Sequence, residues 1–149
     1  MSARIDYLAA APQAVQALSS AGKYLHAEKF DPKLKALVEL RVSQINGCAY
    51  CLNVHSQEAR ALGETQQRLD CLPAWRETTF YTEREQAALA WAESLTLISQ
   101  THAPDDVYHE VSKHFSGKEL VDLTLVIVNI NSWNRISIGF HKETPVRTA

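Results

Sequence analysis

The sequence has little of what marks several large classes of protein. Its 149 residues include only five Gly, five Pro and three Cys, with no low-complexity tract. An odd number of cysteines argues against a framework of structural disulfides. The formal net charge is −2, so the basic excess typical of nucleic-acid-binding and membrane-surface proteins is lacking. We therefore expect no nucleic-acid partner and no membrane partner.

Long apolar runs are also lacking. The most apolar stretch, residues 120–130, carries Asp122 and Asn129 and is too short to span a bilayer. The N-terminal stretch is interrupted by Asp6 and Pro12, which does not fit a signal peptide or a membrane anchor. We therefore expect a cytoplasmic protein.

What the chain does have is a succession of helix signals. Its length and its 46% apolar content suffice for one domain, residues 1–149, with a core that needs no disulfide or metal. Asp31 followed by Pro32 is typical of a helix start, and Thr82 and Ser116 each begin a capping box. The predicted helices cover about 12–25, 32–46, 48–62, 65–72, 82–98, 104–114 and 120–138.

The last predicted helix is ambiguous in its residue types. Its many β-branched residues favour a strand, but strands seldom exceed about 10 residues. It is apolar nearly all round, so we expect it in the core or at a subunit interface. No other segment resembles a strand, and the predicted fold class is all-α.

The candidate chemistry lies at the start of the helix predicted from Cys48. Cys48, Cys51 and His55 fall at positions i, i+3 and i+7, within about 60° of one another on one helix face. A helix N-terminus favours the Cys48 thiolate, and His55 is placed to accept a proton from Cys51, its i, i+4 neighbour. An oxidised cysteine then has a second thiol beside it for disulfide formation. The pattern indicates thiol redox chemistry.

Two other interpretations of the cysteine pair remain possible on the sequence. A C-x-x-C pair is often half of a zinc site, for which Cys71 or Glu39 would have to complete the ligands. The pair could also be purely structural. Haem attachment is excluded, because Leu52 stands where C-x-x-C-H requires a histidine.

Several runs of residues carry a family resemblance. Residues 40–55, 82–91, 119–124 and 131–135 are similar to the AhpD-like alkylhydroperoxidases of the carboxymuconolactone decarboxylase superfamily, so the resemblance covers about 34–140. It implies an all-α, single-domain AhpD-like fold that forms homo-oligomers, trimers or hexamers, through long apolar helices. It also implies hydroperoxide reduction without metal, haem or flavin, sustained by a lipoyl-protein or thioredoxin-like reductant.

The resemblance also implies a role for each site residue. Cys51 attacks the peroxide, Cys48 resolves the product into a disulfide, and His55 activates Cys51. Family members often have a relay glutamate twelve residues before the first cysteine, where this chain has Ala36. Glu39, one helical turn nearer the cysteines, is a candidate to replace it. The alternative is that Glu39 is a solvated surface residue.

Two further functions remain open on the sequence alone. One is a carboxymuconolactone decarboxylase-like enzyme that acts on a lactone, with His55 as acid and base. The other is a non-catalytic helical oligomer that senses oxidants or holds zinc. The decarboxylase branch generally lacks the cysteine pair, which favours the redox reading.

Overall fold

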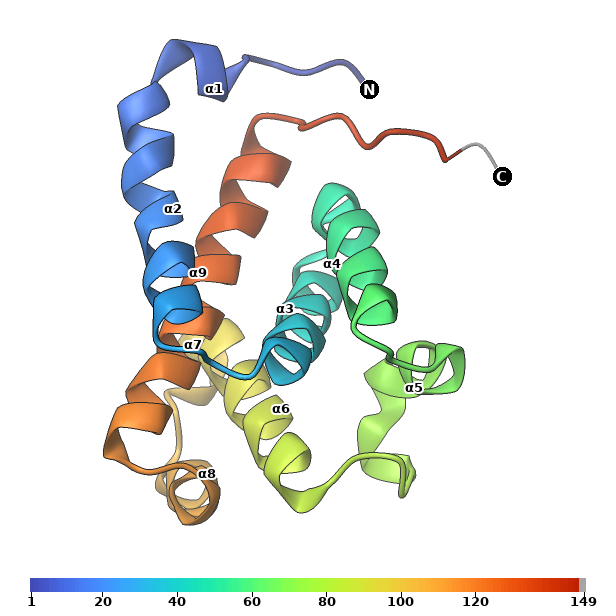
Figure 1. Cartoon of the computed structure of the whole chain (residues 1–149), viewed down its shortest axis with the longest axis vertical. Coiled ribbons are helices and arrows are strands. Elements are labelled where there is room, and N and C mark those ends of the chain that lie inside the picture. Colours follow the sequence, from blue (N-terminus) through green and yellow to red (C-terminus); the bar gives the residue numbers. More distant parts are fainter. Residues whose placement is uncertain (148–149) are drawn as a thin grey trace.

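The structure is a computed structural model, and it describes residues 1–147. The fold is all-α, as the sequence predicts: these residues contain α-helices and one 3₁₀ helix and no strand (Figure 1). None of the described helices is both long and apolar enough to cross a membrane. The elements are α1 (Tyr7–Ala10), α2 (Pro12–Ala27), α3 (Pro32–Asn46), α4 (Ala49–Ala61), α5 (Gln66–Cys71), η1 (Leu72–Glu77), α6 (Glu83–Thr96), α7 (Ile98–Thr101), α8 (Asp105–His114) and α9 (Gly117–Gly139).

Capping residues set the ends of the longer helices where the sequence predicts them. The Asp31 carboxylate accepts hydrogen bonds from the backbone N–H groups of the first turn of α3. Gly47 ends that helix in the left-handed conformation, with φ of 69°. Thr82 and Ser116 form the predicted capping boxes of α6 and α9. The seven predicted helices are confirmed to within a few residues.

Three short elements are missing from the prediction. The four-residue helices α1 and α7 and the 3₁₀ helix η1 are too short to show a helical period in the sequence. The start of α1 is fixed locally, because the Asp6 side chain accepts hydrogen bonds from two backbone N–H groups of that turn. These elements matter below, because α1 contributes to the wall of the candidate site.

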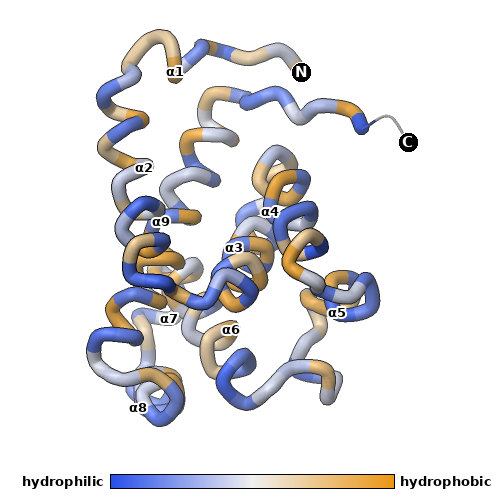
Figure 2. The backbone as a smooth tube through the Cα atoms, in the orientation of Figure 1, coloured by the Kyte–Doolittle hydropathy of each residue, from blue (hydrophilic) through white to orange (hydrophobic). Residues whose placement is uncertain are grey.

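Helix α3 is central to the packing and contacts α4, α6 and α9 (Figure 1). One core cluster joins α3, α6 and α9 with residues of α2, α4 and α8, and a second joins α3, α4, α5, η1 and α6. Figure 2 shows hydrophobic and hydrophilic residues alternating along these helices. Fully burying a Leu, Ile or Val side chain contributes about 1.5–3 kcal/mol each. Core side chains with at most 1% exposure include Leu37, Val38, Val42, Leu72, Leu89, Leu123 and Ile127.

Helix α9 is buried on one side only. Leu123, Ile127 and Ile130 are fully buried, whereas Val121 and Val128 are 68% and 53% exposed in the single chain. The expectation of a core helix therefore holds for one face of α9. A subunit interface on the other face stays a prediction.

Candidate functional site

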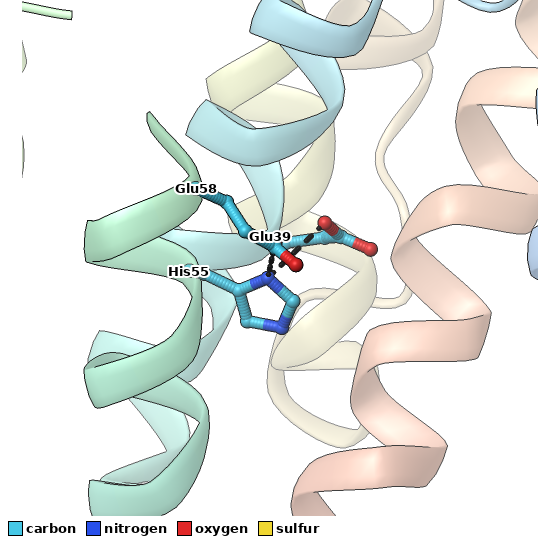
Figure 3. A group of neighbouring side chains, drawn as sticks. All are labelled: Glu39, His55 and Glu58. Atoms are coloured by element: carbon cyan, nitrogen blue, oxygen red, sulfur yellow. Dashed lines mark hydrogen bonds and ion pairs between the residues drawn. The ribbon is translucent and has the colours of Figure 1, made fainter. Parts of the chain in front are cut away.

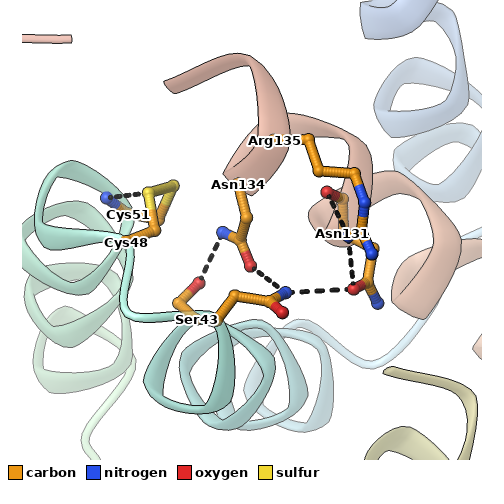
Figure 4. The surroundings of a disulfide bond; sticks show 7 residues. Ser43, Cys48, Cys51, Asn131, Asn134 and Arg135 are labelled. Carbon is orange, nitrogen blue, oxygen red and sulfur yellow. Dashed lines mark hydrogen bonds between the residues drawn. A yellow bond between two sulfur atoms is a disulfide. The ribbon is translucent and has the colours of Figure 1, made fainter. Parts of the chain in front are cut away.

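The two cysteines lie at the start of α4, as the sequence predicts. Cys48 is the N-cap of the helix and Cys51 lies in its first turn, and the two form a disulfide with a Cα–Cα distance of 5.3 Å (Figure 4). The Cys48 sulfur also accepts a hydrogen bond from the Cys51 backbone N–H at 3.3 Å. Both residues are buried, with 1% and 2% exposure. The structure therefore shows the oxidised state of a pair of cysteines at a helix N-terminus.

A polar network fixes the turn that precedes this pair. The fully buried Asn134 of α9 donates through Nδ2 to the Ser43 hydroxyl at 3.1 Å and accepts from Asn46 Nδ2 at 2.9 Å (Figure 4). Asn46 Nδ2 also donates to Asn131 Oδ1 at 3.0 Å. These bonds hold the C-terminal end of α3 against α9. Sequence reasoning did not single out Ser43 or Asn46, because no motif marks them.

The Nδ1 atom of His55 faces two carboxylates, those of Glu39 and Glu58 (Figure 3). This atom is 2.8 Å from Glu58 Oε2 and 3.3 Å from Glu39 Oε2. The hydrogen bond from His55 lowers the pKa of the Glu58 carboxyl, so this group is ionised at neutral pH. Two carboxylate neighbours require a proton on Nδ1, which leaves Nε2 as the proton acceptor of the neutral ring.

Glu39 is buried, which excludes the alternative that it is a solvated surface residue. It is 4% exposed, and its Oε1 accepts a hydrogen bond from Lys35 Nζ at 2.7 Å. Its Oε2 has no hydrogen-bond partner in the described part of the chain and faces the His55 ring. A buried carboxylate is tolerated where cations compensate it. This one is placed to stabilise positive charge on the imidazole.

The same three residues are the candidate metal ligands of the site. Glu39, His55 and Glu58 each offer one ligand atom, and these atoms lie within 4.8 Å of one another. The Lys35 ammonium already occupies the other Glu39 oxygen and would repel a divalent cation. A zinc site that uses the two cysteines is not formed in this structure, because Cys48 and Cys51 are bonded to each other and offer no thiolate ligand. The third cysteine is a partly buried free thiol in α5.

A pocket of about 340 Å³ opens onto Cys51 and His55. Cys48 is not part of its lining, so in this state a small molecule in the pocket meets only one of the two cysteines. The pocket lies between α2, α4 and α9 and is closed by segments next to both chain termini. Its other lining residues are Tyr7, Leu8, Val15, Ser19, Tyr50, Val54, Trp133, Ser137 and Lys142.

Comparison with known proteins places the chain among relatives of similar length. It is 44% identical over 139 residues to the uncharacterized protein YdfG of Bacillus subtilis strain 168, covering 93% of this chain and 95% of YdfG. It is 39% identical to the crystal structure of ATU0492 from Agrobacterium tumefaciens, a protein of unknown function for which an antioxidant defence role as AhpD has been suggested. That comparison has a TM-score of 0.94 and covers 98% of this chain and 100% of the other.

A more distant structure shares the fold alone. The debrominase Bmp8 is 21% identical, with a TM-score of 0.82 over 93% of this chain and 75% of its own. The fold therefore also occurs in a protein that is named for debromination. The model of the carboxymuconolactone decarboxylase family matches residues 9–94, which is more than half of the chain. The chain belongs to the carboxymuconolactone decarboxylase family and is an AhpD-like member of its superfamily.

Proposed function

We propose that this protein is a thiol-dependent hydroperoxide reductase in which Cys51 is the attacking thiol and Cys48 the resolving thiol. The observation that carries the proposal is the pocket, which reaches Cys51 and His55 but not Cys48. A small hydroperoxide in this pocket meets the thiol that has a histidine one helical turn away. The second thiol lies behind it, at disulfide distance.

The chemistry begins with the reduced pair. His55 Nε2 accepts the proton of the Cys51 thiol, and the thiolate attacks the terminal oxygen of R–O–O–H. The O–O bond breaks, and the alkoxide takes a proton from His55 and leaves as the alcohol. Cys51 is now a sulfenic acid. The Cys48 thiol loses its proton and attacks the Cys51 sulfur, the S–O bond breaks, and the leaving hydroxide takes up that proton and departs as water. The two thiols have supplied the two electrons that reduce the peroxide.

In this proposal Glu39 and Glu58 are positioning residues that act through His55. They hold the proton on Nδ1, so that Nε2 is the basic nitrogen, and they stabilise the imidazolium formed after proton transfer. Glu39 is the more effective of the two because its carboxylate is buried, while the Glu58 side chain is 50% exposed. Glu39 thereby replaces the relay glutamate that family members often have at the position of Ala36.

The disulfide is restored by an external dithiol. One thiolate of the reductant attacks the protein disulfide, a mixed disulfide forms, and the second thiol of the reductant releases the reduced pair. A lipoyl-protein or thioredoxin-like dithiol balances the electrons, and no metal, haem or flavin is required. Because the pair must be reduced again after each turnover, we propose a cytoplasmic setting.

We also propose that the chain forms a homo-oligomer, a trimer or hexamer, through the exposed apolar face of α9. Val121 and Val128 lie seven residues apart on that helix and leave large apolar areas uncovered in the single chain. Val128→Glu is expected to lower the mass measured by light scattering after gel filtration. An unchanged mass would place the interface elsewhere.

The test of the proposed function is turnover of an organic hydroperoxide with dihydrolipoamide as reductant. The wild type is expected to consume peroxide over many cycles, whereas Cys51→Ser and Cys48→Ser are expected to lose turnover. If the cysteine variants turn over like the wild type, or the wild type does not turn over, the proposal is wrong. Hydrolysis or decarboxylation of a carboxymuconolactone that survives in both variants would favour the lactone enzyme instead.

A further inference from the structure

A single lysine stands at the rim of the site pocket. Lys142 follows the end of α9, and its Nζ lies 5.6 Å from the centre of the Tyr7 ring and 5.5 Å from the centre of the Tyr50 ring. All three residues line the pocket that opens onto Cys51. A cation against aromatic faces is stabilised by about 0.5–2 kcal/mol, so the two rings hold the ammonium at the pocket.

Among the residues that the structure describes, no carboxylate neutralises the charge of this lysine. No carboxylate lines the pocket, and within residues 1–147 no carboxylate lies at ion-pair distance from Lys142. The neighbouring Glu143 instead accepts a hydrogen bond from the Ala3 backbone N–H at 3.4 Å. The pocket thus presents one lysine ammonium that has hydrogen-bond donors to offer and no anionic partner in the described part of the chain.

The rest of the lining is mainly apolar or aromatic. Leu8, Val15, Val54 and Trp133 supply apolar walls for a hydrocarbon or aryl group in the pocket that Lys142 and Cys51 also line. A volume of about 340 Å³ is at the small end of ligand pockets, which fits a monocyclic aryl compound or a short alkyl chain. An apolar body that carries an anion as well as the reacting group is complementary to this lining.

We propose that the pocket selects organic hydroperoxides that carry a carboxylate. The carboxylate binds the Lys142 ammonium, the apolar body packs on Trp133 and Val54, and the terminal peroxide oxygen faces Cys51. This specificity rests on the proposed function of the cysteine pair. A charge-assisted hydrogen bond contributes about 1.5–3 kcal/mol, which corresponds to a preference of roughly tenfold or more.

Three matched substrates test the proposal: cumene hydroperoxide, its 4-carboxylate and the methyl ester of that carboxylate. They share the same O–O bond and differ in charge. With reduced wild type we expect the carboxylate to react about tenfold faster than the other two. Lys142→Met is expected to remove that preference, so that the three substrates react at similar rates, and Lys142→Arg is expected to retain it. Lys113→Met, at an exposed lysine on α8, is the matched control.

Equal rates for the three substrates with the wild type would overturn the specificity while leaving peroxide reduction intact. A preference that survives in Lys142→Met would also overturn it. Binding separates this failure from failure of the proposed function. If no hydroperoxide reacts, calorimetric titration of the oxidised protein with the 4-carboxylated and neutral cumyl alcohols still tests charge recognition. Tighter binding of the carboxylate that is lost in Lys142→Met supports it, and equal binding rejects it.

Discussion

Substituting the two carboxylates beside His55 should slow the reaction by very different amounts. Glu39→Gln removes a buried charge 3.3 Å from Nδ1, and Glu58→Gln removes a half-exposed charge 2.8 Å from it. At an effective dielectric constant of about 20, the attraction across 3.3 Å is about 5 kcal/mol. The Lys35 ammonium on the other Glu39 oxygen offsets part of it, and Glu58 still holds the ring. We expect a net loss of about 2 kcal/mol in transition-state stabilisation, which is roughly 30-fold in rate.

The half-exposed Glu58 is the matched control for this experiment. Exposed ion pairs contribute about 0–1 kcal/mol, so Glu58→Gln is expected to slow the reaction by about fivefold at most. Its effect should shrink at high salt, because solvent ions screen exposed charges more than buried ones. The effect of Glu39→Gln should persist.

The assay is stopped-flow fluorescence of the reduced protein mixed with excess cumene hydroperoxide, which gives the second-order rate constant for the first step. Urea unfolding of each variant checks that the fold is retained. The proposed role of the buried Glu39 carboxylate is refuted if Glu39→Gln reacts as fast as the wild type, or if Glu58→Gln is the slower variant.

Three further predictions concern stability. Reducing the Cys48–Cys51 disulfide opens only a very short loop, so we expect a loss of about 2 kcal/mol and a fall in Tm of about 4–8 °C by calorimetry, not unfolding. Burial alone would raise the pKa of Glu85, but the hydrogen bonds from Arg68 and Thr82 and the positive charge of Arg68 together outweigh it, and the pKa is lowered. Glu85 therefore contributes stability above its ordinary pKa that is lost as the pH falls through the lowered value, and the destabilisation by Glu85→Gln in urea should be smaller at pH 3 than at pH 7. Asn134→Ala leaves the buried Ser43 hydroxyl without its Asn134 partner, while Asn46 keeps its bond to Asn131. The substitution should cost about 2 kcal/mol in urea unfolding, since an orphaned buried group costs about 1–3 kcal/mol. A cost below 1 kcal/mol would show that water replaces the lost bonds.

The parts of the site that could be predicted are those that depend on local spacing. Cys48, Cys51 and His55 share a helix, so their proximity follows from 3.6 residues per turn once the helix start is placed. Glu58 follows His55 by three residues, and this spacing could have indicated the contact. Caps and glycines fixed the helix ends for the same local reason.

The parts that could not be predicted depend on contacts between distant segments. Glu39 lies off the apolar stripe of α3, and only the packing of α4 against that face makes it a buried residue. Tyr7 and Lys142 are 135 residues apart in the numbering, on segments without helical periodicity, and yet they meet at the pocket. No local signal in either segment specifies this encounter.

The most direct test of the central claim is intact mass after one equivalent of cumene hydroperoxide is added to the reduced, metal-free protein. The account predicts that the wild type loses two hydrogens as the disulfide forms. It predicts that Cys48→Ser gains one oxygen as the Cys51 sulfenic acid, and that Cys51→Ser remains unreacted. If Cys51→Ser is oxidised as fast as Cys48→Ser, or if all three proteins react slowly and alike, then Cys51 is not an activated thiol that attacks the peroxide.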